Sequence, residues 1–278
     1  MIQPEDSASG DKPSFDTKSL FLQLGRSLKK IQPGAISEAQ DCFYDAMEAQ
    51  TEEESQMLLS RALELDPGNT DAWLVIMSRT PAISADEEIG ILRKIVAMGE
   101  ERLGKKAFTE FAGHFWGYHE TRPYMRARAA LADALHRAGR IESSAAEVEA
   151  MLELNPGDNQ GLRYRLLASY LTLRRMEDAS RLSERYADEV EYNTVIAWSK
   201  VLVLFISGEL DEASKAVAVA QKQNGFSKAY ILGHRKIPKN LPDSYSLGSK
   251  EEAVCFAGDL QLAWKAYPEA KKWLATLK

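Results

Sequence analysis

The sequence contains few cysteines, few histidines and no long hydrophobic run. Cys42 and Cys255 lie far apart and match no metal or redox spacing, which favours a reducing compartment and buried thiols. The longest apolar run, Val201–Ile206, is six residues long, whereas a membrane-spanning helix needs about 18. The first residues show no basic segment followed by an apolar one, so no secretory signal is visible. We therefore expect a cytoplasmic protein with no membrane partner.

Positive charge is also in short supply. Lysine and arginine together number 35 against 41 acidic residues, and the net charge is −6. Proteins that bind nucleic acids need a positive surface for the phosphates, so we expect no nucleic-acid partner. The hydrophobic and charged fractions, 45% and 27%, are ordinary for a soluble folded chain.

Recognisable catalytic motifs are missing as well. The sequence has no phosphate-binding glycine loop of either common type and no nucleophile elbow, and Cys42 has no histidine near it in sequence. We therefore expect no enzymatic activity and no cofactor. An alternative is a metal-binding or enzymatic site in the His114–Arg122 segment. A zinc protease motif would need a second histidine after His119-Glu120, but Thr121-Arg122-Pro123 follows. An aromatic loop with surface histidines is the simpler interpretation, and we expect no metal.

A recurring phrase is the strongest positive signal. Gly139–Pro156 reads G-R-I-E-S-S-A-A-E-V-E-A-M-L-E-L-N-P, Arg61–Pro67 reads R-A-L-E-L-D-P, and Gly208–Ala220 reads G-E-L-D-E-A-S-K-A-V-A-V-A. A unit that recurs at roughly 34 residues is typical of stacked helix pairs. No strand-type alternation of any length is present. The sequence therefore predicts an all-α fold, with helix pairs at 36–69, 70–102, 124–156, 159–190 and 192–225.

The two ends depart from this repeat. Residues 1–17 are polar and predict a disordered tail, and residues 18–34 predict an amphipathic helix that caps the first pair. The repeat solenoid is expected over 35–228, and a capping segment over 229–278. In that last segment Pro238 and Pro242 break any helix, and Ser249 offers an N-cap for the helix that follows. Tyr267-Pro268 ends that helix, and Pro268 starts a final short one.

The repeats resemble the tetratricopeptide (TPR) superfamily over about 36–225. Three stretches, 123–145, 155–171 and 229–270, are more narrowly similar to bacterial relatives of suppression-of-tumorigenicity-seven-type proteins. The last stretch reads A-Y-I-L-G, then G-S-K-E-E-A-V-C-F-A-G-D-L-Q-L-A-W. This resemblance implies a TPR-like right-handed helical solenoid with a family-specific C-terminal cap, and it implies no catalytic activity.

In TPR proteins the first helix of each pair lines a concave groove. The resemblance places Arg126, Asp133, His136 and Arg137 of the third pair at groove positions, together with Tyr164 of the fourth. Such side chains can hold a carboxylate or an acidic peptide by charge-assisted hydrogen bonds. The alternative is that neighbouring acidic side chains already pair with these arginines.

The fifth pair has an apolar set at the same positions, namely Val195, Trp198, Leu202, Phe205 and Ile206. An exposed patch of this kind would mark a binding site, but the helix around Ala253–Trp264 can cover it. We expect the C-terminal helices to fold back onto this end. The function expected is a non-enzymatic scaffold or adaptor that binds a protein or peptide partner, with an oligomeric structural element as a further alternative.

Overall fold

The computed structural model describes Leu24, Ile31 and residues 33–80, 83–238, 240–242 and 244–277. Over these residues the chain is built from helices, and none of them lies in a strand. The all-α class expected from the sequence is confirmed. The predicted tail at 1–17 and almost all of the predicted cap helix at 18–34 lie outside the described residues. Leu24 is described, and its side chain is buried.

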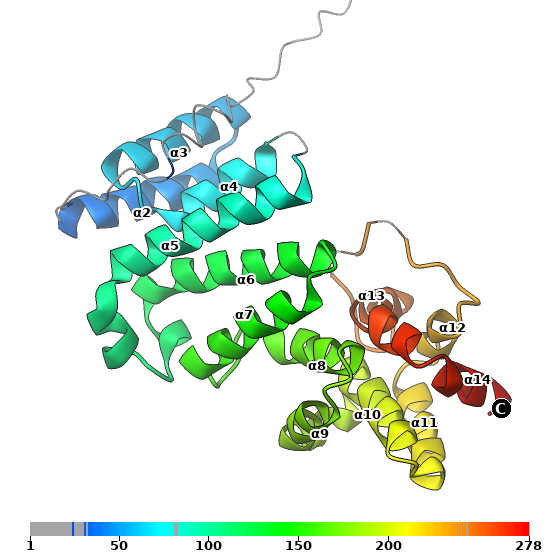
Figure 1. The fold of residues 1–278 in the computed structure, drawn as a ribbon. Coiled ribbons are helices and arrows are strands. Elements are labelled where there is room, and N and C mark those ends of the chain that lie inside the picture. Colours follow the sequence, from blue (N-terminus) through cyan, green and yellow to red (C-terminus); the bar gives the residue numbers. More distant parts are fainter. Residues whose placement is uncertain are drawn as a thin grey trace, which may run out of the picture. The chain divides into compact units, whose positions relative to one another are not determined.

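The chain forms two compact units, Met1–Ala138 and Gly139–Lys278, hereafter the N-terminal and C-terminal units. Figure 1 shows the course of the helices. The N-terminal unit contains α2 (Pro33–Glu48), α3 (Glu52–Leu65), α4 (Thr70–Arg79), α5 (Ala85–Glu110) and α6 (Arg122–Arg137). The C-terminal unit contains α7 (Ile141–Leu154), α8 (Leu162–Thr172), α9 (Met176–Arg185), α10 (Thr194–Ile206), α11 (Leu210–Gln223), α12 (Ser227–Ile231), α13 (Lys250–Ala266) and α14 (Pro268–Thr276).

Side-chain caps fix the starts of three helices in the N-terminal unit. Thr51, Asn69 and Ser84 each accept a hydrogen bond from a backbone N–H in the first turn of α3, α4 and α5. At α5 the cap is reciprocal, because the Glu87 carboxylate accepts from the Ser84 backbone N–H at 3.0 Å. These bonds satisfy amide groups that a helix terminus otherwise leaves unpaired.

The aromatic segment between α5 and α6 is short, because α5 extends to Glu110 and α6 starts at Arg122. Helix α5 passes through a kink at Gly104 and continues to Glu110. Gly104 has φ +67°, a conformation that only glycine adopts without strain. Two short 3₁₀ turns follow, η1 (Phe115–Gly117) and η2 (His119–Thr121), and α6 then starts with Pro123 in its first turn.

Two apolar clusters hold the N-terminal unit together. The larger lies among α4, α5 and α6 and includes Trp73, Leu92 and Leu131, with Leu24 against it. The smaller joins α2, α3 and α4. Its members include Leu59 and Ala62 of α3. Both side chains are fully buried.

The end of the C-terminal unit folds back on its middle. Helix α13 packs against α8 and α10, and α14 contacts α10 (Figure 1). Phe205 of α10 meets Trp273 of α14 with ring centroids 5.0 Å apart. The apolar first helix of the fifth pair is therefore covered from within the chain, as the sequence predicted.

A buried carboxylate stabilises the packing of α13 against α10 and α11. Glu252, in the first turn of α13, accepts hydrogen bonds from the Thr194 hydroxyl at 2.9 Å and from the Asn224 side-chain amide at 2.8 Å. It also accepts from the Gly248 backbone N–H at 2.6 Å. The starts of α10 and α13 and the end of α11 thus converge on one side chain that is only 5% exposed.

Candidate functional site

Arg126 is tied to a buried acid of its own unit. Its Nε and Nη2 donate to the two carboxylate oxygens of Asp71 at 2.7 and 2.5 Å. Asp71 lies in the first turn of α4 and is 2% exposed. Burial alone lowers the pKa of Arg126, but the hydrogen bond and charge of Asp71 outweigh it and raise the pKa. This bidentate pair is a structural link between α4 and α6, because Arg126 already uses its forked donors on Asp71.

Arg137, at the end of α6, is more accessible. Its Nη2 donates to Glu88 of α5 at 2.5 Å, and 60% of its side chain is exposed. An exposed ion pair of this kind contributes little to stability, about 0–1 kcal/mol. Arg137 can therefore exchange Glu88 for another carboxylate at small cost.

Arg137 and Asp133 line one hollow of the N-terminal unit, with a volume of about 430 Å³. We call it the α4–α6 hollow. Its apolar wall is provided by partly buried side chains and by one fully buried leucine, and its remaining lining is polar. The lining residues are Leu74, Met77, Ser78, Thr80, Ile83, Glu88, Leu92, Ala130, Asp133 and Arg137. Only two of these, Asp133 and Arg137, were candidates from the sequence. The apolar wall was missed, because helical periodicity assigns those positions to the core.

His136 lies on α6, as Asp133 and Arg137 do, and its side chain is partly buried. Burial, and then the neighbouring charge of Arg137, lower its pKa from the usual 6.5. Its Nδ1 is buried and has no hydrogen-bond partner among the described residues. The lowered pKa favours the neutral imidazole, so His136 is poorly suited to attract an acidic partner by charge.

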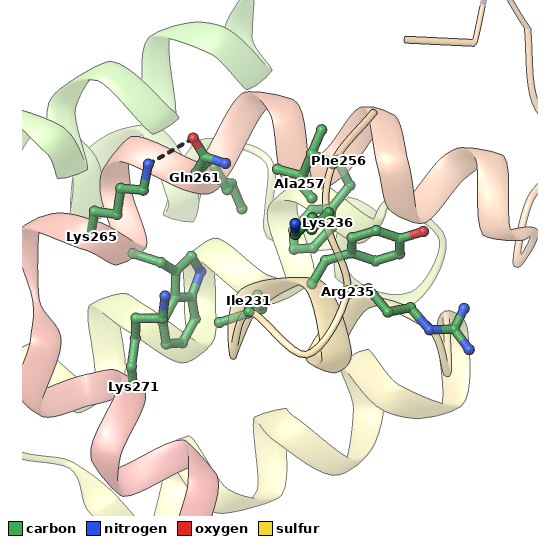
Figure 2. A pocket seen from close by; sticks show the side chains of 13 residues that line it. Ile231, Arg235, Lys236, Phe256, Ala257, Gln261, Lys265 and Lys271 are labelled. Atoms are coloured by element: carbon green, nitrogen blue, oxygen red, sulfur yellow. Dashed lines mark hydrogen bonds between the residues drawn. The ribbon is translucent and has the colours of Figure 1, made fainter. Parts of the chain in front are cut away.

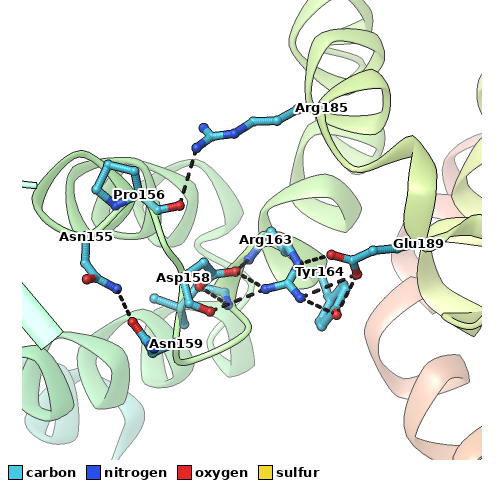
Figure 3. Close-up of polar contacts among 9 residues, drawn as sticks. Asn155, Pro156, Asp158, Asn159, Arg163, Tyr164, Arg185 and Glu189 are labelled. Carbon is cyan, nitrogen blue, oxygen red and sulfur yellow. Dashed lines mark hydrogen bonds and ion pairs between the residues drawn. The ribbon is translucent and has the colours of Figure 1, made fainter. Parts of the chain in front are cut away.

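Tyr164 belongs to the C-terminal unit, where its hydroxyl is part of a closed network (Figure 3). It accepts from Arg163 at 2.6 Å and donates to Glu189 at 2.8 Å. Arg163 also donates to Glu189 at 3.0 Å and to Asp158 at 2.8 Å. Burial and the hydrogen bond to Glu189 raise the pKa of Tyr164. Each polar group of this network has a partner within the unit, so the network positions the start of α8 and the turn before it.

The alternative site at His114–Arg122 forms the two 3₁₀ turns and the start of α6. The side chains of His114 and His119 are exposed. Arg122 donates from Nε to the Trp116 carbonyl at 2.9 Å, and its guanidinium lies 5.7 Å from the Trp116 ring centroid. Within the part of the chain that the structure describes, no group of three or more His, Cys, Asp or Glu side chains is arranged to hold a metal ion.

A second recess lies in the C-terminal unit, where sequence reasoning proposed no site. This open cavity, of about 360 Å³, is lined by α12, the turn after it, α13 and the start of α14. We call it the C-terminal cavity. Its lining residues are Tyr230, Ile231, Gly233, Arg235, Lys236, Ile237, Phe256, Ala257, Leu260, Gln261, Trp264, Lys265 and Lys271. Figure 2 shows these side chains from close by.

Within the described part of the chain, no helix is both long enough and apolar enough to cross a membrane. Comparisons with protein families, with curated proteins and with solved structures found no match to this chain.

Proposed function

We propose that this chain is a non-enzymatic interaction scaffold or adaptor that binds a protein or peptide partner. In this proposal its helix pairs are TPR-like units of a right-handed solenoid, and the segment from 229 onward is a cap. Solenoids of this kind present surfaces assembled from successive first helices, and they serve in binding far more often than in catalysis.

The packing of the helix pairs supports this interpretation. Helices α2 and α3, α8 and α9, and α10 and α11 pack against each other across short turns, as do α4 and α5. Small buried residues recur in the second helices of these pairs. Ala179 of α9 and Ala213 of α11 are each the fourth residue of the second helix of their pair, and both are fully buried.

The observation that carries the proposed binding role is the α4–α6 hollow beside Arg137. A recess with an apolar wall and a few polar groups at its edge is the usual form of a binding site. Leu74, Met77 and Ile83 remain partly exposed in its wall. The partner that fits is a peptide segment that inserts one apolar side chain and offers a carboxylate to Arg137.

Affinity capture with mass spectrometry tests this role, with the full chain as bait. Arg137→Glu removes the cation at the edge of the hollow. Arg93→Glu is the matched control, because Arg93 is an exposed residue of α5 outside the lining. We expect a partner that the wild type and Arg93→Glu retain and that Arg137→Glu loses.

Binding of the purified partner then gives the affinity. We expect at least a tenfold loss for Arg137→Glu, with unchanged circular dichroism. Identical partner sets and affinities for the two variants would reject the α4–α6 hollow as the binding site.

A further inference from the structure

The C-terminal cavity has an apolar wall along one face of a single helix. Phe256, Leu260 and Trp264 are spaced four residues apart on α13, so they follow one another along the same side of it. Their side chains are buried, and Ile231 of α12 adds a further apolar contribution. A ligand that enters must therefore carry an apolar body, because a hydrated group would lose water against these rings.

The charged groups of the lining all have one sign. Arg235, Lys236, Lys265 and Lys271 line the cavity, and none of the lining residues is an Asp or Glu. Among the described residues, no carboxylate forms an ion pair with any of these four cations. The net charge of the chain is −6, so this is a local positive site in an acidic protein.

Two of the four cations, Lys265 and Lys271, are close enough for their charges to interact. Lys265 and Lys271 lie on the same side of the cavity in Figure 2, whereas Arg235 extends away on the other side. Arg235 instead lies over the Phe226 ring, 5.4 Å from its centroid. Lys265 donates to the Gln261 side-chain oxygen at 2.9 Å, a neutral partner that leaves its charge uncompensated. Burial, and then the charge of Lys265, lower the pKa of Lys271. An anion between the two ammonium groups would relieve that repulsion.

The volume restricts the kind of ligand. About 360 Å³ lies at the small end of the range for pockets that hold small molecules. A cation is disfavoured by four like charges, and a purely apolar ligand leaves the lysines unused. An apolar body that bears one anionic group satisfies both the rings and the ammonium groups.

We propose that the C-terminal cavity is a binding site for a small organic anion. The apolar body of the ligand packs against Phe256, Leu260 and Trp264, and its carboxylate lies between Lys265 and Lys271. This site is separate from the α4–α6 hollow and does not depend on the adaptor role.

Three matched probes test the proposal on the full chain: 2-naphthoate, the neutral 2-naphthylmethanol and the cationic 2-naphthylmethylamine. Binding is followed in ¹H–¹⁵N spectra by the indole signals of the five tryptophans. The Trp264 signal is identified by its absence in Trp264→Phe. We expect saturable binding of 2-naphthoate that shifts the Trp264 signal most, at least tenfold tighter than the alcohol.

Reversal of the charge of both lysines is the more discriminating test. Lys265→Glu/Lys271→Glu is expected to weaken 2-naphthoate at least tenfold and to make the amine the preferred ligand. Lys222→Glu on α11 is the matched control, because Lys222 is exposed and outside the lining, and it is expected to bind 2-naphthoate as the wild type does. Unchanged thermal unfolding shows that the variants remain folded, and these outcomes together support the site.

Other outcomes overturn it. Equal affinity for acid and alcohol would show that the lysines select nothing. A preference for 2-naphthoate that survives the charge reversal would place the site elsewhere. If the cavity instead takes a short acidic peptide through the same lysines and ignores 2-naphthoate, the ligand is macromolecular and the proposal fails.

Discussion

Trp198 of α10 and Trp264 of α13 meet edge to face, with ring centroids 6.2 Å apart and planes 73° to each other. Both indoles are almost fully buried. Edge-to-face contact places the positive edge of one ring against the negative face of the other, which adds to the stabilisation from burial. This contact joins residues 66 positions apart in sequence, and it fixes the C-terminal segment to the fifth helix pair.

Removal of that segment is expected to unfold or aggregate the protein. A chain truncated after residue 226 lacks α12, α13 and α14, so Trp198 and Phe205 lose the rings that cover them. The apolar face of α10 that becomes exposed in this way promotes association. Light scattering and chemical denaturation measure the result. A truncated chain that is monomeric and as stable as the full protein would show that the segment is dispensable for folding.

A point substitution reports on the same contact. Trp264→Ala is expected to lower the free energy of unfolding of the C-terminal unit by about 3–5 kcal/mol, because a large buried side chain is removed and a cavity remains. Trp273→Ala on α14 is the comparison, because Trp273 retains part of its exposure. Urea denaturation followed by fluorescence gives both values. A loss below about 1 kcal/mol for Trp264→Ala would contradict the assigned packing.

Glu252 is expected to matter far more than its neighbour Glu251. Glu252→Ala leaves the Gly248 N–H without its acceptor and removes one of the two acceptors of the Asn224 side-chain amide, which still donates to the Ser249 carbonyl. Buried unpaired donors cost about 1–3 kcal/mol each. We expect a destabilisation of about 3 kcal/mol by chemical denaturation. Glu251→Ala removes an exposed acid from the same helical turn and should change the stability little. Equal effects of the two substitutions would reject Glu252 as the residue that stabilises the packing of α13.

Arg126 and Arg137, both on α6, should differ clearly in their effect on stability. Arg126→Gln leaves buried Asp71 without its cation, and breaking a buried pair in this way costs about 3–5 kcal/mol. Because 35% of the Arg126 side chain is exposed, we expect the lower end of that range. Arg137→Gln breaks an exposed pair and should cost less than about 1 kcal/mol. Unfolding of the N-terminal unit, followed by the fluorescence of its tryptophans, distinguishes the two. The reverse order would contradict the assignment of Arg126 to structure and Arg137 to the surface.

Asp259 of α13 should give the C-terminal unit a distinctive pH dependence. Burial raises its pKa from 3.8 to about 6, and the charge of Arg165 lowers it only in part. Between pH 4 and pH 6 the folded state keeps a proton that the unfolded chain has released. The contribution of Asp259 to stability is therefore present at low pH and is lost as the pH rises through about 6.

The variant Asp259→Asn cannot titrate at this position. The unfolding free energy of Asp259→Asn minus that of the wild type is therefore expected to rise by about 2–3 kcal/mol from pH 4 to pH 7. Denaturation curves at several pH values measure this difference directly. A difference that stays constant or falls over that interval would contradict the raised pKa.

Much of the helix pattern could be read from local signals. Ser249 was expected to cap the helix after it, and its hydroxyl accepts from the Glu252 N–H at 3.1 Å. Pro268 was expected to begin the last helix, and α14 begins there. These features depend on neighbouring residues alone, which is why a single sequence specifies them. Pro33 falls inside the cap helix predicted over 18–34, but it starts α2, because proline is well suited to a first helical turn.

The candidate sites were far less predictable. Arg126 pairs with Asp71, 55 residues away, and no spacing rule connects two positions that meet only when α4 lies against α6. Tyr164 fitted a groove position, but its hydroxyl is held by Arg163 and by Glu189, 25 residues further along the chain. Lys265 and Lys271 gave no signal, because basic residues near helix ends are common on solvated surfaces. Their place in the C-terminal cavity depends on how α12, the turn after it, α13 and α14 pack together.

The central claim is that a partner binds at the α4–α6 hollow, and site-specific photocrosslinking in cells tests it most directly. The photoreactive residue p-benzoylphenylalanine replaces exposed Ser78, which lines the hollow, or exposed Arg93, which does not. We predict a discrete adduct from position 78 that is absent from position 93 and disappears when Arg137→Glu is added. The same adducts from both positions, or an adduct at position 78 that Arg137→Glu leaves unchanged, would contradict the account.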